Sequence, residues 1–327
     1  MLESFIYSFN SVAPIFLLVL LGMLLKKIGF LGDDYCKIAD KLVFKIALPF
    51  EMVKSVSRTE FSKIFSQENI KIIVFFLIGI VFAFVILCLT VPLFLKDNAK
   101  RGSFIQGAFR GNFAIFAIPL ATNMFGDAGK IAATPLLPVV TIMFNILTVI
   151  GFNIFAPKEN EKKSFWTLIK EILINIAKNP LIIGICIGFV FSLLNTETGI
   201  AIPDFVFKPI SDVAACAVPL ALISIGVNFK PENLKGRIGV AAWSMAVKNI
   251  FLPAAALGVA LLFGFRGIAL TMVLVSFGSP TSVSSYIMAK NMHGDHELAG
   301  QILLLTTVCS LVTVFMFVFV LKQFAFI

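Results

Sequence analysis

Charged residues are scarce in this sequence, and the residue types that build most active sites are scarcer still. Only 14% of the 327 residues are charged, two are histidines, and the five cysteines stand far apart from one another. We find no cluster of zinc ligands, no phosphate-binding loop and no nucleophile elbow, so the sequence predicts no enzyme, no cofactor and no metal site. The scattered cysteines also argue against a disulfide framework.

Apolar residues, in contrast, are abundant: they make up 59% of the chain, with 36 phenylalanines against two tryptophans and three tyrosines. This composition is typical of a polytopic membrane protein. The net charge of +9 therefore predicts basic loops that set orientation in a bilayer, and no nucleic-acid surface. The N-terminus carries Glu3, whereas Lys26 and Lys27 follow the first apolar run. This order predicts a retained first helix with its N-terminus outside.

The apolar runs predict ten membrane-spanning helices joined by short loops. If the N-terminus is outside, the loops and helix ends on the inner side carry more lysine and arginine than those on the outer side. This bias predicts a multi-pass protein of the inner or plasma membrane with both ends on the non-cytoplasmic side. The predicted spans are 6–25, 38–56, 70–95, 102–124, 128–155, 174–194, 205–228, 238–263, 267–292 and 298–321.

Two of these spans are interrupted. The segment 101–126 contains Gly107, Gly111 and Pro119 together with polar side chains, and the segment 266–294 contains the weak helix centre GSPTS at 278–282. Both segments end alike, in ATNMFGD from Ala121 and AKNMHGD from Ala289, at an offset of 289 − 121 = 168 residues. Interrupted spans at corresponding places in two halves indicate the binding site of a secondary transporter.

The same offset predicts two repeats. The polar stretch 157–165 falls between the fifth and sixth spans, which leaves five helices in 1–156 and five in 166–327. Because five is odd, the second half enters the membrane in the opposite sense, as in an inverted repeat. Pro49 and Pro219, in the second and seventh spans, also correspond, at an offset of 170.

The runs GNFAIFAIPLATNMFG, LVFKIALP, VPLALISIGVNF and SFGSPTSVSSYIMAKNM resemble the auxin efflux carrier family. This family includes plant PIN-type auxin carriers and bacterial permeases for malonate, malate and similar carboxylates. The resemblance covers nearly the whole chain. It implies an all-α fold similar to NhaA-type sodium/proton antiporters and bile-acid transporters, with helices four and nine crossing at their breaks.

The resemblance further implies a homodimer and two bodies in each protomer: a scaffold of 1–60 and 166–230, and a transport domain of 66–156 and 236–327 that moves like an elevator. It also implies a proline at each break, here Pro119 and Pro280. The 168-residue offset instead pairs Pro119 with Ile287 and Asn112 with Pro280. Either the two breaks differ by up to two turns, or the local alignment slips.

Physical chemistry alone predicts an anion site at the breaks, because each broken helix presents a half-helix N-terminus with free N–H groups and a positive dipole. The predicted substrate-binding residues are Asn112, Phe113, Phe116, Pro119, Ser279, Pro280, Thr281, Ser282, Lys248 and Asn145. The predicted crossover and gating residues are Gly111, Gly278, Arg110, Lys45, Pro49, Glu51 and Pro219.

Ionisable residues inside spans are functional candidates by default. Lys248 lies ten residues into the eighth span, where it either attracts an anion or alternates in protonation with substrate binding. The competing interpretation is an ion pair with Glu51, or a lysine that reaches back to the membrane surface.

The leading hypothesis is a secondary active transporter of small organic acids, such as malonate, malate or auxin-like acids, coupled to H⁺ or Na⁺ or to neither. One alternative is a sodium/proton-type exchanger of the same fold, although the breaks hold Asn, Ser and Thr where an exchanger needs Asp. The other is a membrane receptor that binds a ligand without transporting it.

Overall fold

The computed structural model describes residues 2–57, 67–155, 180–199, 202–228, 238–282 and 284–327, and five further residues from 166 to 178. The regular elements of these residues are helices, joined by short turns and loops. The predicted linker 157–165 lies outside them. The α-helices are α1 (Leu2–Lys27), α2 (Asp33–Leu42), α3 (Leu48–Ser57), α5 (Gln67–Phe94), α6 (Asn98–Phe109), α7 (Ile118–Ala133), α8 (Leu136–Ile154), α10 (Pro180–Thr198), α11 (Asp204–Ala215), α12 (Ala217–Asn228), α13 (Ile238–Ala246), α14 (Leu252–Leu262), α15 (Gly267–Gly278), α16 (Ser284–Asn291) and α17 (His296–Gln323).

Within the described residues, six helical segments are long and apolar enough to cross a membrane, and α1 makes a seventh if its bent halves count as one span. The protein is therefore a polytopic membrane protein. Many large apolar side chains are exposed along these helices, for example Ile78 and Leu89 on α5, as expected for surfaces that face lipid.

The predicted fifth span is wrong at its start. The structure continues α7 through a kink at Gly126 (φ 60°) to Ala133, and α8 begins only at Leu136. Pro135 is the N-cap of α8. Because a proline has no N–H to continue the preceding helix, residues 127–133 form a separate short helical piece.

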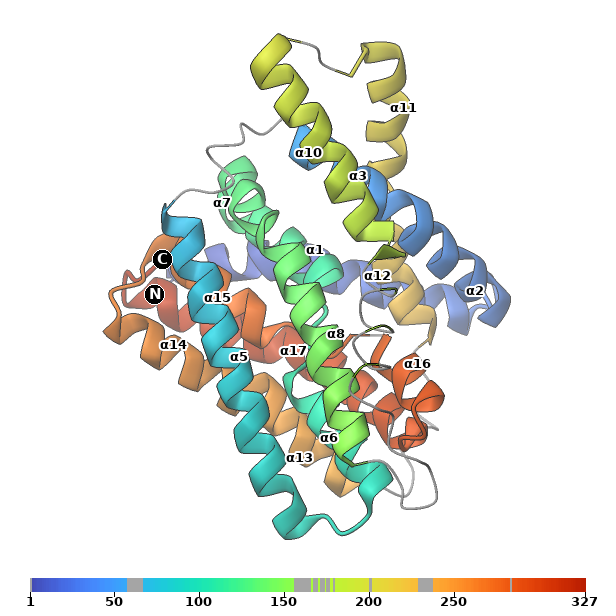
Figure 1. Ribbon diagram of the computed structural model, residues 1–327, viewed down its shortest axis with the longest axis vertical. Coiled ribbons are helices and arrows are strands. Elements are labelled where there is room, and N and C mark those ends of the chain that lie inside the picture. Colours follow the sequence, from blue (N-terminus) through green and yellow to red (C-terminus); the bar gives the residue numbers. More distant parts are fainter. Residues whose placement is uncertain are drawn as a thin grey trace.

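Small residues let helices from the two halves of the chain pack closely. A Cβ on Gly184 of α10 would lie 2.5 Å from the Pro49 carbonyl oxygen of α3, and a Cβ on Gly226 of α12 would lie 2.0 Å from the Val19 carbonyl oxygen of α1. Figure 1 shows α3, α10 and α11 together at one end of the molecule, and the two termini close to each other away from that end, at the left of the view.

Three short π-helical turns each precede a proline: η1 (Val43–Ala47), η2 (Phe113–Ala117) and η4 (Val247–Phe251). In η2 the Ile118 N–H bonds to the Phe113 carbonyl, five residues back, and Pro119 follows. A proline clashes with the carbonyl four residues before it in an α-helix, and the wider π turn relieves that clash. The expectation of a break at Pro119 is therefore wrong, since the helix runs through Pro119 unbroken.

Candidate functional site

The two interrupted segments meet at their breaks. The first leaves helical geometry between α6 and η2, at Arg110–Asn112, and the second between α15 and α16. Gly111 and Thr281 form an antiparallel bridge, and the Asn112 N–H donates to the Pro280 carbonyl at 2.7 Å. Asn112 and Pro280 are also the two residues that the predicted 168-residue offset pairs, because 280 − 112 = 168.

Further hydrogen bonds and close packing hold the two breaks together. The Thr281 hydroxyl donates to the Gly107 carbonyl at 2.8 Å, and the Thr281 N–H donates to Thr306 of α17 at 3.2 Å. A Cβ on Gly111 would lie 2.4 Å from the Ser279 hydroxyl, so only glycine fits there without a shift. These contacts fix the geometry of both breaks.

A cavity of about 520 Å³ lies at the crossing, where Arg110, Gly111 and Asn112 line it. Its volume is within the size range of small-molecule sites. We call it the crossing cavity. It extends from the buried Arg110 at the crossing to the exposed Lys45 of η1. Its polar lining residues are Lys45, Arg110, Asn112, Thr141, Asn145, Ser282 and Ser284, and its larger apolar ones are Phe44, Phe113, Val140, Phe144, Val149, Leu181 and Met288.

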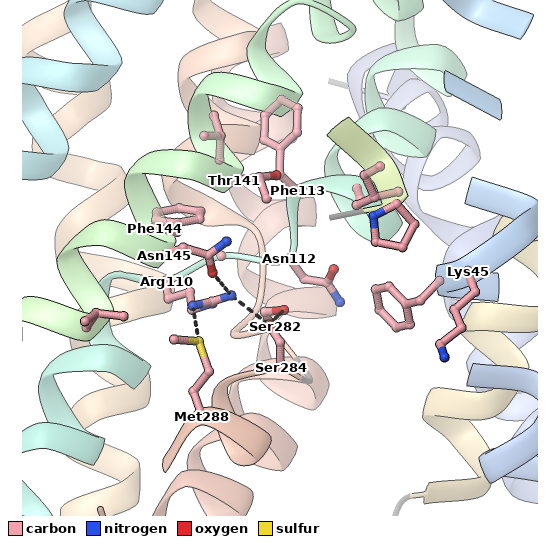
Figure 2. Close-up of a pocket in the computed structure, with 17 residues that line it drawn as sticks. Lys45, Arg110, Asn112, Phe113, Thr141, Phe144, Asn145, Ser282, Ser284 and Met288 are labelled. Carbon is pink, nitrogen blue, oxygen red and sulfur yellow. Dashed lines mark hydrogen bonds between the residues drawn. The ribbon is translucent and has the colours of Figure 1, made fainter. Parts of the chain in front are cut away.

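Arg110 dominates the electrostatics of this cavity. Its guanidinium donates to the Asn145 amide oxygen and the Ser284 hydroxyl, each at 2.9 Å, and to the Thr148 hydroxyl at 3.2 Å. It also contacts the Met288 sulfur at 2.9 Å, while its Nε has no partner. Figure 2 shows the guanidinium between Asn145 and Met288, with Asn112 beside it and Lys45 across the cavity.

Arg110 is only 6% exposed, yet no described carboxylate comes within ion-pair distance of it. A buried charge that has only neutral partners is costly and is normally paired. The cavity also contacts the first residues of η2 and of α16, the ends where helix dipoles are positive. None of its described lining residues is an aspartate or a glutamate. The whole arrangement attracts an anion.

Lys248 lies outside this cavity. It is fully buried, and its Nζ donates to the Phe277 carbonyl at 2.8 Å and the Phe109 carbonyl at 3.4 Å. These carbonyls belong to the C-terminal ends of α15 and α6. Lys248 thus neither pairs with Glu51 nor reaches the membrane surface. Glu51 instead forms an ion pair with Lys130 of α7.

The structure brings part of the predicted set together. Asn112, Phe113, Asn145 and Ser282 line the cavity, and so do Gly111, Arg110 and Lys45 from the predicted gating group. The other predicted residues are not among those that line the cavity. Ser279, Pro280 and Thr281 are buried in the second break, Phe116 is buried in η2, and Gly278 ends α15. The three prolines lie within helices: Pro119 in α7, Pro49 in α3 and Pro219 in α12.

Sequence reasoning assigned Arg110 to gating and overlooked Thr141, Phe144, Ser284 and Met288 as cavity residues. One signal was available. Thr141, Asn145 and Thr148 follow one another at spacings of four and three residues in the mostly apolar α8, which places them on one face of that helix. A polar stripe in a membrane helix predicts a polar partner, here Arg110.

Long apolar helices, two broken segments that meet at their breaks, and a cationic cavity beside them define a membrane transporter as the class of this protein. The sequence comparison agrees. Residues 7–318 match the model of the family described as membrane transport protein, and the chain belongs to that family, which also contains the auxin efflux carriers. It is a transporter and not an enzyme.

Two archaeal relatives match almost end to end. An uncharacterized transporter of Methanocaldococcus jannaschii is 24% identical over 93% of this chain and 96% of its own length. One of Methanothermobacter thermautotrophicus is 23% identical over 94% and 97%. The chain is also similar to the probable auxin efflux carrier component 5b of Oryza sativa subsp. japonica, at 20% identity over 49% of this chain and 44% of that protein.

Proposed function

We propose that this protein is a secondary active transporter of small organic anions, chiefly carboxylates, and that the crossing cavity is its substrate site. The observation that carries the proposal is Arg110, a buried guanidinium without a carboxylate partner among the described residues. Two helix N-termini at the same cavity add positive potential. A substrate carboxylate supplies the missing negative charge, and the guanidinium can bind it through two parallel hydrogen bonds.

The apolar side of the cavity suits the carbon skeleton of such an acid. Phe113, Phe144 and Val140 line it together with the polar groups. Asn112 provides an amide for a directed hydrogen bond beside Arg110 (Figure 2). A cation exchanger of the same fold is disfavoured, because Arg110 and Lys45 would repel a cation from this cavity. The matched family is described as membrane transport protein, and this does not support the alternative of a receptor that binds a ligand without transporting it.

The transport cycle that we propose is alternating access between two inverted repeats of five helices, in ten spans, with both termini outside the cytoplasm. Residues 1–60 and 166–230 form the scaffold, and 66–156 and 236–327 form the moving domain. The protein acts as a homodimer in the inner or plasma membrane. On this topology α10 begins at the cytoplasmic side, so a cavity lined by Pro180 and Leu181 faces the cytoplasm.

Equilibrium binding to purified protein tests the substrate site. Mono- and dicarboxylates are titrated against wild type, Arg110→Gln and Arg110→Lys, with Lys290→Gln, an exposed residue of α16, as the matched control. A hydrogen bond to a charged group contributes about 1.5–3 kcal/mol, so we expect Arg110→Gln to weaken binding at least about tenfold. Arg110→Lys should retain part of the affinity. Equal affinities in all four proteins would refute the proposed site.

A further inference from the structure

Lys248 occupies a position that the substrate site does not explain. It lies in η4, it is not among the residues that line the cavity, and its side chain is fully buried. No described carboxylate pairs with it, and its two hydrogen bonds go to main-chain carbonyls of different helices. A buried amine held only by carbonyl oxygens resembles a coordinated cation more than a member of an ion pair.

The surroundings are those of a cation site. Phe109 ends α6 and Phe277 is the penultimate residue of α15, so both carbonyls sit at the negative ends of helix dipoles. A break in a membrane helix leaves such carbonyl oxygens without an N–H donor, so they need another donor or a cation. The hydroxyls of Ser276 and Ser279 are also buried and have no hydrogen-bond partner. A Cβ built on Gly111 would come within 3.5 Å of Ser279 Oγ, Lys248 Nζ and the Ser276 carbonyl oxygen, so these polar atoms converge on one spot.

We propose that this spot is a site for a small monovalent cation and that the ammonium group of Lys248 is its permanent occupant. The tethered ammonium supplies the positive charge that a bound metal ion would supply between the two half-helix ends. The positive charge therefore remains when the substrate leaves. It follows that the protein needs no sodium ion at the crossing, either to keep its fold or to bind substrate.

Chemical rescue tests the site without reference to any substrate. Lys248→Ala removes the ammonium group and leaves space for a free cation of similar size. Thermal unfolding of the purified full-length protein is then followed in choline chloride, sodium chloride, ammonium chloride and methylammonium chloride at equal ionic strength. Lys290→Ala, which truncates an exposed lysine outside the cavity lining, is the matched control.

We expect Lys248→Ala to lower the unfolding midpoint by about 4–8 °C in choline, since two buried carbonyls lose their donor. Ammonium or methylammonium should recover at least half of that shift in the variant and leave wild type and Lys290→Ala unchanged. A variant that unfolds at the same reduced temperature in all four salts would overturn the proposal.

Wild type provides a second measurement that holds even if Lys248→Ala does not fold. Its unfolding midpoint and its carboxylate affinity should be the same in sodium chloride and in choline chloride. A sodium-dependent rise in either quantity would overturn the proposal, because the site would then have room for a free ion. The midpoint in the absence of carboxylate does not depend on the substrate assignment, so a failure here is distinct from a failure of the proposed function.

Discussion

At the scale of single residues, the two buried cations at the crossing have separate roles. Arg110 faces the cavity, where its partners are neutral, whereas Lys248 faces the carbonyl ends of α6 and α15. On our two proposals, Arg110 attracts an anion from solution, and Lys248 compensates charge within the protein. On this division of roles, each buried positive charge has its own compensation, although the breaks contain no aspartate: a bound anion for Arg110 and the helix carbonyls for Lys248.

Lys45 is a second positive group in the crossing cavity, exposed and across from Arg110. A substrate with two carboxylates can use both cations, whereas a monocarboxylate uses only one. We expect Lys45→Gln to weaken dicarboxylate binding by about threefold to fivefold, because an exposed charge contributes up to about 1 kcal/mol, and to leave monocarboxylate binding nearly unchanged.

Titrations of a matched pair, such as succinate and butyrate, at low and high salt would check this prediction. The effect on the dicarboxylate should shrink at high salt, since exposed charges are screened. An equal loss of affinity for both acids would contradict the assignment of Lys45 to a second carboxylate.

At the scale of elements, the crossing depends on a close approach at Gly111. A methyl group there would meet Ser279 Oγ at 2.4 Å and Lys248 Nζ at 3.4 Å. We expect Gly111→Ala to destabilise the protein by about 1–3 kcal/mol, which is the usual cost of overpacking. Thermal unfolding measures the effect, and Ser279→Ala in the same chain should recover part of it by removing the atom that clashes.

Gly239→Ala is the matched control for this experiment. Gly239 lies in α13, and a Cβ there would meet nothing within 4 Å. Its substitution should leave stability unchanged or raise it slightly, because alanine favours a helix more than glycine does. If Gly111→Ala were as harmless as Gly239→Ala, the close packing of the two breaks would be wrong.

The sequence predicted the elements better than it predicted the side chains. Glycine, proline and polar residues in two apolar spans were enough to place both interruptions, since each weakens a helix in hydrocarbon. Within the first interrupted span, Gly111 was among the predicted crossover residues, but the break that the family resemblance placed at Pro119 was wrong, because a proline does not always break a helix. Pro119 is accommodated by the π turn η2, and the chain breaks at Gly111 instead.

The roles of the charged residues depend on contacts between distant parts of the chain. Arg110 and Ser284 are 174 positions apart, and Lys248 and Phe109 are 139 apart. No local pattern indicates to which face of a crossing a lysine or arginine turns. Polar spacing on α8 indicated a partner for Asn145 but not its identity.

At the scale of the whole molecule, one ion pair joins the two bodies of the proposed transport cycle. Glu51 of α3 belongs to the proposed scaffold, and Lys130 of α7 to the proposed moving domain. Both side chains are mostly buried, at 14% and 23% exposure. We expect a cross-link between cysteines at 51 and 130, in a chain without its native cysteines, to stop transport while carboxylate binding persists.

Cysteines at 208 and 212 provide the control for this experiment. Lys208 and Asp212 form an ion pair within α11, entirely inside the proposed scaffold, so their cross-link should leave transport intact. Uptake by cross-linked and reduced protein in liposomes would be compared for both pairs. Full uptake with 51 and 130 joined would show that these two segments do not move apart during the cycle.

The central claim is that an anion held at Arg110 crosses the membrane, and uptake into proteoliposomes tests it most directly. Radiolabelled dicarboxylate is offered to liposomes that contain wild type or Arg110→Gln, under imposed pH and sodium gradients and without any gradient. The account predicts saturable uptake by wild type that unlabelled carboxylates inhibit, and at least a tenfold loss of transport efficiency in the variant. No carboxylate uptake by folded wild type under any gradient, or equal uptake by the variant, would contradict it.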